Sequence, residues 1–353
     1  MKDSHSPYPI CQKSRVLFIC KKRYSYGNGS PYHLSSGLLN SATFVCNMLK
    51  ENGITAEIVD VIDNNSIDRE VSRFKPTHVI IEALWVVPQK FEILHKLHPS
   101  VKWIIRLHSE TPFLSMEGIA VDWLIRYHMM RHSHNIAIAA NSYRMLRDLQ
   151  AMLDTRDVMY LPNYYPVDFK VPNPKPSDSH TVEIGSFGAI RPLKNQFIQA
   201  LAAKEFADSL GKKLIYHING GRIEGKGEPI LKNIRSLFAN SPHHILVEHE
   251  WLEHSDFIKL IRNMDMGLQL SFSETYNIVT ADFVNQNVPV VVSDEISWVN
   301  WMYKADPNEL DDIIRKMKFA YTFRKIGIHK LNKKNLQVNS DDARVTWVAQ
   351  FRK

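Results

Sequence analysis

Short apolar runs alternate with longer amphipathic stretches along this chain, and no other feature constrains its fold as strongly. In the first half the apolar runs predict six strands, at residues 16–20, 56–61, 78–84, 101–107, 135–140 and 158–161. Between them, stretches such as residues 37–52 and 142–153 repeat their apolar residues at helical spacing. Apolar strands separated by helices are typical of a parallel sheet covered on both faces. The sequence therefore predicts an α/β fold with a doubly wound sheet.

A proline-rich segment interrupts the alternation. Residues 171–179 (VPNPKPSDS) hold three prolines among small polar residues, as extended linkers do. After this segment the pattern restarts, with strands predicted at residues 182–187, 213–218, 245–248, 266–270 and 288–292 and helices at about 195–209, 228–239, 255–263 and 279–286. We therefore expect two Rossmann-like domains facing a cleft, over residues 1–170 and 171–340.

The C-terminal tail predicts two further helices. The first covers residues 308–323, and the second covers about 341–353 and is expected to pack back on the first domain. Residues 324–334, between the two helices, are basic. We interpret this stretch as a solvated connection in preference to a binding patch.

Composition and charge indicate the kind of partner and the cellular compartment to expect for this protein. The chain has 353 residues with 44 basic and 37 acidic side chains, and the net charge of +7 suits an anionic partner, either a nucleotide phosphate or a nucleic acid. Its three cysteines argue against a disulfide framework and fit a reducing compartment. The sequence contains no apolar run long enough to span a membrane and no N-terminal apolar leader. We expect a cytoplasmic protein.

The first group of candidate site residues follows the first strand of the second half. Ligands of doubly wound sheets bind beyond the carboxyl ends of the strands. Gly188 would let the backbone approach a ligand, and Arg191 and Lys194 bring two cations to a predicted helix N-terminus. These residues predict a diphosphate site without a Walker motif, although surface charges beside a turn would look the same.

A second group follows the fourth strand of this half. Glu274 precedes a helix expected to begin near Asn277, and Asp282 lies more than one turn inside it. Two carboxylates and the backbone N–H groups of residues 276–279 could bind a phosphorylated ligand rich in hydroxyls. Alternatively, Glu274 interacts with the helix dipole and Asp282 is a surface residue.

Two candidates belong to the first domain. His108 follows the fourth strand, where it could make polar contacts or transfer a proton, although a lone histidine is more often structural. The loop after the first strand mixes cations, aromatic rings and glycine, so it is either a flexible surface loop or a substrate-binding loop. Its candidate acceptor-binding residues are Lys22, Arg23, Tyr24, Tyr26, Tyr32 and His33.

Four segments, in this order, resemble glycosyltransferase family 4. They are residues 161–169 (LPNYYPVDF), residues 188–195 (GAIRPLKN), Glu274 with Asp282 eight positions later, and residues 288–294 (VPVVVSD). The second segment is similar to the family's phosphate-binding segment, and the third to its E-x(7)-E signature. The resemblance covers about residues 15–300 and implies the GT-B fold.

The resemblance also implies roles for individual residues. Arg191 and Lys194 would bind the diphosphate of a nucleotide-sugar donor, with Gly188 and Gly29 nearby. Glu274 would bind hydroxyls of the transferred sugar, and Asp282 the ribose. His108 would lie beside the reacting sugar. The residues whose backbone would contact the donor are Tyr276, Asn277, Ile278 and Val279.

The family typically transfers a sugar with retention of configuration and without a metal ion or other cofactor, and a UDP-sugar is the expected donor. The sequence departs from the family pattern at Asp282, where the family has Glu, at Asn195, where it has Gly, and at residues 285–287, where it has small residues and Gly.

The acceptor and the type of reaction stay open at this level. The acceptor could be a saccharide, a lipid-linked saccharide or a hydroxymethylated DNA base, because the basic and aromatic residues near the N-terminus and at residues 126–134 would suit nucleic acid. A nucleotide-sugar epimerase of the same fold is one alternative to a hexosyl- or pentosyltransferase. A non-catalytic module that binds nucleotide sugars or nucleic acid is another. Oligomeric state is not predicted.

Overall fold

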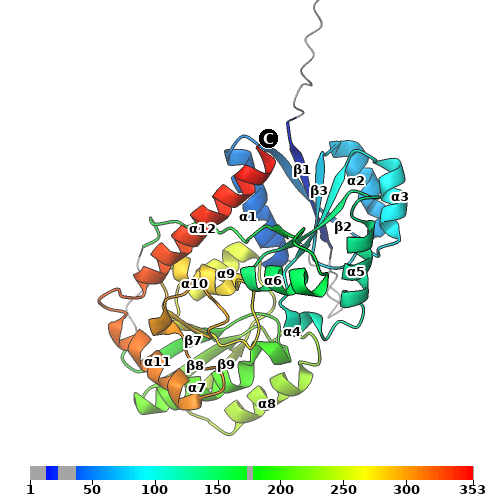
Figure 1. Cartoon of the computed structure of the whole chain (residues 1–353). Helices are drawn as coiled ribbons and strands as arrows, with labels where there is room; N and C mark the ends of the chain where they lie inside the picture. The colour runs from blue at the N-terminus through cyan, green and yellow to red at the C-terminus, as the bar shows by residue number, and fades with distance from the viewer. Residues whose placement is uncertain (1–12, 23–36, 173–177, 353) are drawn as a thin grey trace, which may run out of the picture.

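The computed structural model describes residues 13–22, 37–172 and 178–352, and these form two lobes, each built on one parallel sheet (Figure 1). The first lobe holds a six-stranded sheet in the order β2-β1-β3-β4-β5-β6. Its strands are β1 (Arg15–Lys21), β2 (Thr55–Val61), β3 (His78–Glu82), β4 (Lys102–Leu107), β5 (Ile136–Ala140) and β6 (Met159–Tyr160). The predicted parallel sheet is thus confirmed.

Two hydrophobic cores cover the opposite faces of this sheet. Because successive side chains of a strand point to opposite faces, Val16 and Phe18 of β1 enter one core and Leu17 and Ile19 enter the other. The first core is closed by α1 (Gly37–Glu51), and the second by helices on the other face. These are α2 (Ile67–Phe74), α3 (Lys90–Leu97), α4 (Thr111–Leu114), α5 (Ala120–Met130) and α6 (Tyr143–Met152).

The second lobe repeats this plan with a five-stranded parallel sheet in the order β11-β10-β7-β8-β9. Its strands are β7 (Thr181–Ser186), β8 (Lys213–Ile218), β9 (Ile245–Glu248), β10 (Met266–Gln269) and β11 (Val290–Val292). Its helices are α7 (Gln196–Ser209), α8 (Glu228–Ala239), α9 (His254–Ile261), α10 (Ile278–Asn285) and α11 (Leu310–Phe323). The prolines at 174 and 176 of the predicted linker lie outside the described residues.

The C-terminal helix is longer than predicted. A single helix, α12 (Lys330–Phe351), spans both lobes and ends beside α1 (Figure 1). Near its end, Trp347 packs on Phe18 and donates to the carbonyl of Pro162 at 2.8 Å. The expected start near residue 341 is therefore wrong, and part of the basic stretch belongs to the helix. No helix in the described ranges is long and apolar enough to cross a membrane.

The basic stretch is also not wholly solvated, because Lys333 is buried. Its ammonium donates to the carbonyl of Asn285 at 2.7 Å and to the Asn287 side chain at 3.2 Å. Asn287 has a φ of 59°, the left-handed conformation that glycine favours and asparagine tolerates. The departure from the family pattern at residues 285–287 thus preserves the backbone turn and adds a contact to α12.

We expect Lys333 to make stability depend on pH. Burial lowers the pKa of Lys333 to about 8, whereas the unfolded chain keeps a lysine pKa of about 10.4. Between these values the unfolded state binds more protons, so the free energy of unfolding gains a contribution that rises with pH. Urea denaturation at pH 7.5 and at pH 10 measures this contribution. The free energy of unfolding should rise less between the two pH values for Lys333→Met than for the wild type. The exposed neighbour Lys334→Met is the matched control, and equal gains in all three proteins would contradict this assignment.

Candidate active site

The candidate site lies where the strand order of the second sheet reverses. From β7 the chain moves through β8 and β9 toward one edge, whereas β10 and β11 lie on the other side of β7. Doubly wound sheets bind ligands beyond the carboxyl ends of their strands at such a reversal. The loop after β7 holds Lys194 and the loop after β10 holds Glu274, so the topology brings these two loops together.

Lys194 and Glu274 form a hydrogen-bonded ion pair at this junction. Both side chains are largely buried, with 14% and 9% of their surfaces exposed. Burial alone would raise the pKa of Glu274, but the charges of Lys194 and Arg191 hold it below its usual value. Glu274 is therefore an ionised acceptor at neutral pH. The ammonium of Lys194 carries three donors, so its bond to Glu274 leaves donors for a further anion.

Arg191 is held beside this pair with much of its hydrogen-bonding capacity unused. Its guanidinium lies 4.9 Å from the ring centre of Phe113, which belongs to the first lobe, and 3.7 Å from the Glu224 carboxylate. Its Nε is buried and has no hydrogen-bond partner within the described part of the chain. Because a buried donor without a partner is costly, this atom indicates a place for an anionic ligand.

The backbone on either side of these cations takes a positive φ. Gly188 has a φ of 118°, and Asn195 has a φ of 55°. Asparagine tolerates this conformation, and the Asn195 amide donates to the carbonyls of Leu270 and Pro307 at 3.1 and 2.8 Å. Asn195 therefore supports the turn at which the family pattern has glycine. The helix predicted at about residues 195–209 begins at Gln196, directly after this turn.

Asn277 caps the start of α10, close to where the sequence predicts that this helix begins. Its side chain accepts from the backbone N–H of Thr280 at 2.9 Å, and its φ is 62°. The next two residues, Ile278 and Val279, line the adjoining pocket. Tyr276 instead buries its ring in the core, where it packs on Trp298. Only its backbone remains a candidate for donor binding.

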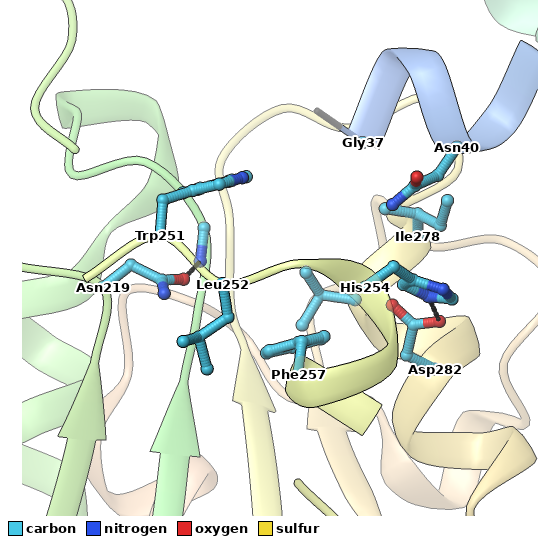
Figure 2. Close-up of a pocket in the computed structure, with 11 residues that line it drawn as sticks. Gly37, Asn40, Asn219, Trp251, Leu252, His254, Phe257, Ile278 and Asp282 are labelled. Carbon is cyan, nitrogen blue, oxygen red and sulfur yellow. Dashed lines mark hydrogen bonds and ion pairs between the residues drawn. The ribbon is translucent and has the colours of Figure 1, made fainter. Parts of the chain in front are cut away.

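A pocket adjoins the turn at Gly188 (Figure 2). Trp251 and Asn219 lie on one side of this pocket, and His254 and Asp282 lie on the other. Its lining is mostly apolar, with a few polar side chains, as is usual for small-molecule sites. The lining residues are Gly37, Asn40, Gly188, Asn219, Trp251, Leu252, His254, Phe257, Ile278, Val279 and Asp282.

Asp282 is buried at the edge of this pocket, with 2% of its surface exposed. The hydroxyl of Tyr165 donates to its Oδ1 at 2.7 Å, and His254 Nε2 bonds the same oxygen at 2.8 Å. Burial raises the pKa of Asp282, while the bonds from His254 and Tyr165 oppose that rise. The interpretation of Asp282 as a surface residue is therefore wrong.

His108 belongs to a buried charged cluster at the end of the first sheet. Its Nε2 bonds Glu82, whose carboxylate also contacts Arg106 Nη1 at 3.1 and 3.2 Å. Burial and then the Arg106 charge lower the pKa of His108, so the imidazole is neutral at pH 7. The ionised Glu82 accepts from Nε2–H, and Nδ1 lies 3.4 Å from the Asn141 amide. Both ring nitrogens of His108 therefore have a partner, Nε2–H in Glu82 and Nδ1 in the Asn141 amide, so the ring suits a hydrogen-bonding role.

Contacts between the lobes bring His108 close to the Glu274 loop. The Thr275 hydroxyl donates to the His108 carbonyl at 3.3 Å and accepts from the Asn141 amide at 3.1 Å. Arg144 donates to the Glu274 carbonyl at 3.0 Å. The structure thus gathers His108 and Glu274, with the cations beside Glu274, at the junction of the two lobes.

Comparison with known proteins identifies the architecture. The sequence matches no protein-family model and no curated protein sequence. The structure resembles sucrose-phosphate synthase from Thermosynechococcus elongatus, with a TM-score of 0.68, 9% identity, and coverage of 96% of this chain and 98% of that one. The chain has the GT-B fold.

Two further solved GT-B structures show the same likeness. HepE from Anabaena, solved with UDP and glucose, has a TM-score of 0.60 and 13% identity over 96% of this chain and 98% of that one. A TarM mutant from S. aureus, solved with fondaparinux, alpha-GlcNAc-glycerol and UDP, has a TM-score of 0.52 and 12% identity. That match covers 78% of this chain and 52% of TarM, so the chain spans about half the length of that protein.

Most of the predicted acceptor loop cannot be placed in this GT-B structure. The predicted site residues outside the described part of the chain are Arg23, Tyr24, Gly29, Tyr26, Tyr32 and His33. Lys22 is described and half-buried after β1, where its backbone N–H donates to the carbonyl of Val61 at 2.7 Å. The basic stretch at residues 126–134 lies on α5 and the turn before β5. It therefore lies toward the amino ends of the strands, the edge opposite His108.

Sequence reasoning missed the partners of the predicted site residues. Asn219 directly follows β8, and Trp251 and His254 follow β9 closely, so their positions after strands were an available signal. Glu82 and Arg106 each stand in an apolar strand, where a charge needs a partner. No cluster of three or more His, Cys, Asp or Glu side chains suited to a metal ion occurs among the residues that the structure describes.

Proposed function

We propose that this chain is a glycosyltransferase that moves a sugar from a UDP-sugar to an acceptor hydroxyl. The observation that carries this proposal is the pair of cations at the strand reversal of a GT-B fold. Among the described residues the buried Nε of Arg191 has no partner, and Lys194 can donate beyond its bond to Glu274. The Lys194 side chain also lies beside Gly188, which lines a pocket that contains a buried carboxylate. This arrangement suits a diphosphate joined to a nucleoside.

The residues around this pair would act on the leaving group and on the sugar. As the bond between the anomeric carbon and the diphosphate breaks, its electron pair passes to the diphosphate oxygen, and Arg191 and Lys194 stabilise that charge. These two cations supply positive charge at the diphosphate, so we propose transfer without a metal ion. Glu274 remains ionised and would accept hydrogen bonds from hydroxyls of the transferred sugar.

The engagement of both ring nitrogens of His108 supports retention of configuration. His108 lies across the junction from the Glu274 loop as a hydrogen-bonding group, and its Nε2 is committed to Glu82. Because Nδ1, the basic nitrogen of the neutral ring, faces the Asn141 amide at 3.4 Å, we propose that the acceptor hydroxyl attacks without a protein base, from the face that the diphosphate leaves. The acceptor proton then passes to the departing diphosphate oxygen, and the new glycosidic bond keeps the original configuration.

We propose a saccharide acceptor in preference to a DNA base. The resemblance implies that the acceptor binds mainly to the first lobe and that His108 lies beside the reacting sugar. The second basic and aromatic segment, at residues 126–134, lies toward the opposite edge of the first sheet, so it is poorly placed to hold DNA at this site. Its Arg126 is also paired with Asp122 at 3.0 Å.

A panel of reactions analysed by mass spectrometry tests the proposed function. Purified protein is incubated with UDP-glucose, UDP-galactose, UDP-N-acetylglucosamine or UDP-xylose, each with mixed saccharides or hydroxymethylated DNA. We expect a saccharide one sugar heavier and an equal amount of UDP. A modified DNA base would instead establish the alternative acceptor. A changed nucleotide sugar without acceptor would indicate an epimerase, and binding without turnover a non-catalytic module.

A further inference from the structure

Asp282 presents one carboxylate oxygen to the pocket and fixes the other. Both Tyr165 and His254 bind Oδ1, at 2.7 and 2.8 Å, so Oδ2 is the oxygen that these bonds leave for a ligand. Asp282 also lines the pocket (Figure 2). Two donors on one oxygen hold the plane of the carboxylate and therefore the direction in which Oδ2 can accept a bond.

The two donors are themselves held in place from the first lobe. Phe44 of α1 packs edge-on against the ring of Tyr165, with a centroid distance of 5.3 Å, and against the imidazole of His254 at 5.7 Å. Aromatic rings favour this geometry. The position of Asp282 is therefore set by α9, by α1 and by the segment that follows β6.

His254 is also the charged partner of this buried carboxylate. A carboxylate buried without a cation would take up a proton and lose an acceptor. Burial opposes a charge on the imidazole as well, but Asp282 raises the pKa of His254 above its usual value. Each group therefore favours the charged form of the other, and Tyr165 adds a neutral hydrogen bond to the same oxygen.

We propose that His254 is a positioning residue that aims Asp282 at the ribose hydroxyls of the donor and so makes this pocket select nucleotides that carry these hydroxyls over analogues that lack both. This inference rests on the proposed function. A ribose hydroxyl can donate to Oδ2, whereas a dideoxyribose would leave a buried carboxylate oxygen unpaired. Sites built to bond a hydroxyl reject analogues that lack it for this reason.

Calorimetry with UDP and 2′,3′-dideoxy-UDP tests this assignment. The wild type should bind UDP at least about 10-fold more tightly than the dideoxy analogue, the size expected for a charged hydrogen bond. His254→Ala should reduce that preference to about 2-fold by weakening UDP binding, with little effect on the analogue. His254→Gln keeps a neutral donor and should retain an intermediate preference. His243→Ala, an exposed histidine at the other edge of the sheet, is the matched control.

The possible results separate the inference from the proposed function. If His254→Ala weakens UDP and the dideoxy analogue equally, His254 is only structural and the inference is wrong, while the proposed function stands. If His254→Ala binds UDP and the dideoxy analogue as tightly as the wild type does, the inference is overturned in the same way. If the wild type binds neither UDP nor the diphosphates of adenosine, guanosine and cytidine, the proposed function fails and the inference fails with it.

Discussion

Replacing Arg106 with methionine should lower the free energy of unfolding by about 3–5 kcal/mol, the usual cost of removing one partner of a buried ion pair. Arg106 is fully buried in β4, and each nitrogen of its guanidinium makes a hydrogen bond. Its guanidinium contacts Glu82, donates to Asn163 Oδ1 at 2.6 Å and bonds the carbonyls of Leu161 and Pro162 at 2.9 and 3.1 Å. The substitution leaves the Glu82 carboxylate buried with the neutral His108 as a hydrogen-bond partner but without its cation.

Urea denaturation at pH 7 measures this cost. Lys102→Met, at the partly exposed start of the same strand, is the matched control and should change stability by less than about 1 kcal/mol. The double variant Glu82→Met with Arg106→Met removes both charges and should recover part of the loss, because no unpaired charge remains. An Arg106→Met protein within 1 kcal/mol of the wild type, on the scale of ordinary surface substitutions, would contradict the account of this cluster.

Replacing Lys194 with alanine should weaken UDP binding by about 1.5–3 kcal/mol, the range for hydrogen bonds to charged groups. This corresponds to roughly 10- to 150-fold in the dissociation constant. Two causes act together, since the variant loses a phosphate contact and also leaves Glu274 without its hydrogen-bonded cation. The pKa of Glu274, which Lys194 holds low, should then rise. Sugar transfer should fall further than UDP affinity, because the leaving diphosphate develops charge in the transition state.

Calorimetry with UDP and the initial rate of transfer measure these two effects. Lys204→Ala is the matched control, because Lys204 lies on α7 and pairs with Asp208 at 3.0 Å, away from the candidate site. It should leave both quantities within about 2-fold of the wild type. UDP affinity in Lys194→Ala equal to that of the wild type would remove Lys194 from the donor site.

Apolar patterning was sufficient to predict the sheets of this fold. Each predicted strand overlaps an observed one, because wholly buried strands are marked by continuous apolar runs bounded by turns. Two strands, at residues 213–218 and 245–248, have the predicted bounds. The pattern contains no information on which strands are neighbours, so the strand reversal beside Lys194 became visible only in the structure.

The start of α12 was not predicted because its buried face carries several polar side chains and its exposed face carries apolar ones. Its buried face includes polar side chains, among them Asn332, Lys333 and Ser340, while Val338 and Val345 are exposed. Helical periodicity is recognised by apolar residues on one face, so this distribution hides it. These polar residues are buried because they bond other elements, as Lys333 does with the end of α10 and Ser340 with the backbone N–H of Tyr165. Sequence spacing cannot show such contacts.

The candidate site was predictable only in part for a related reason. Segments similar to a family pattern identified Arg191, Lys194, Glu274 and Asp282, and the geometry brings the first three together. The partners that set their charge and direction, such as His254 and Tyr165, come from other elements. No local spacing links those partners to the segments they serve.

A structure of the protein with UDP bound tests the central claim most directly. We predict diphosphate oxygens within about 3 Å of the Lys194 ammonium and the Arg191 guanidinium, the distance of a charge-assisted hydrogen bond. The ribose should lie against Asp282 in the pocket of Figure 2. UDP bound elsewhere on the chain, or a diphosphate held by a metal ion and not by these two cations, would contradict the account.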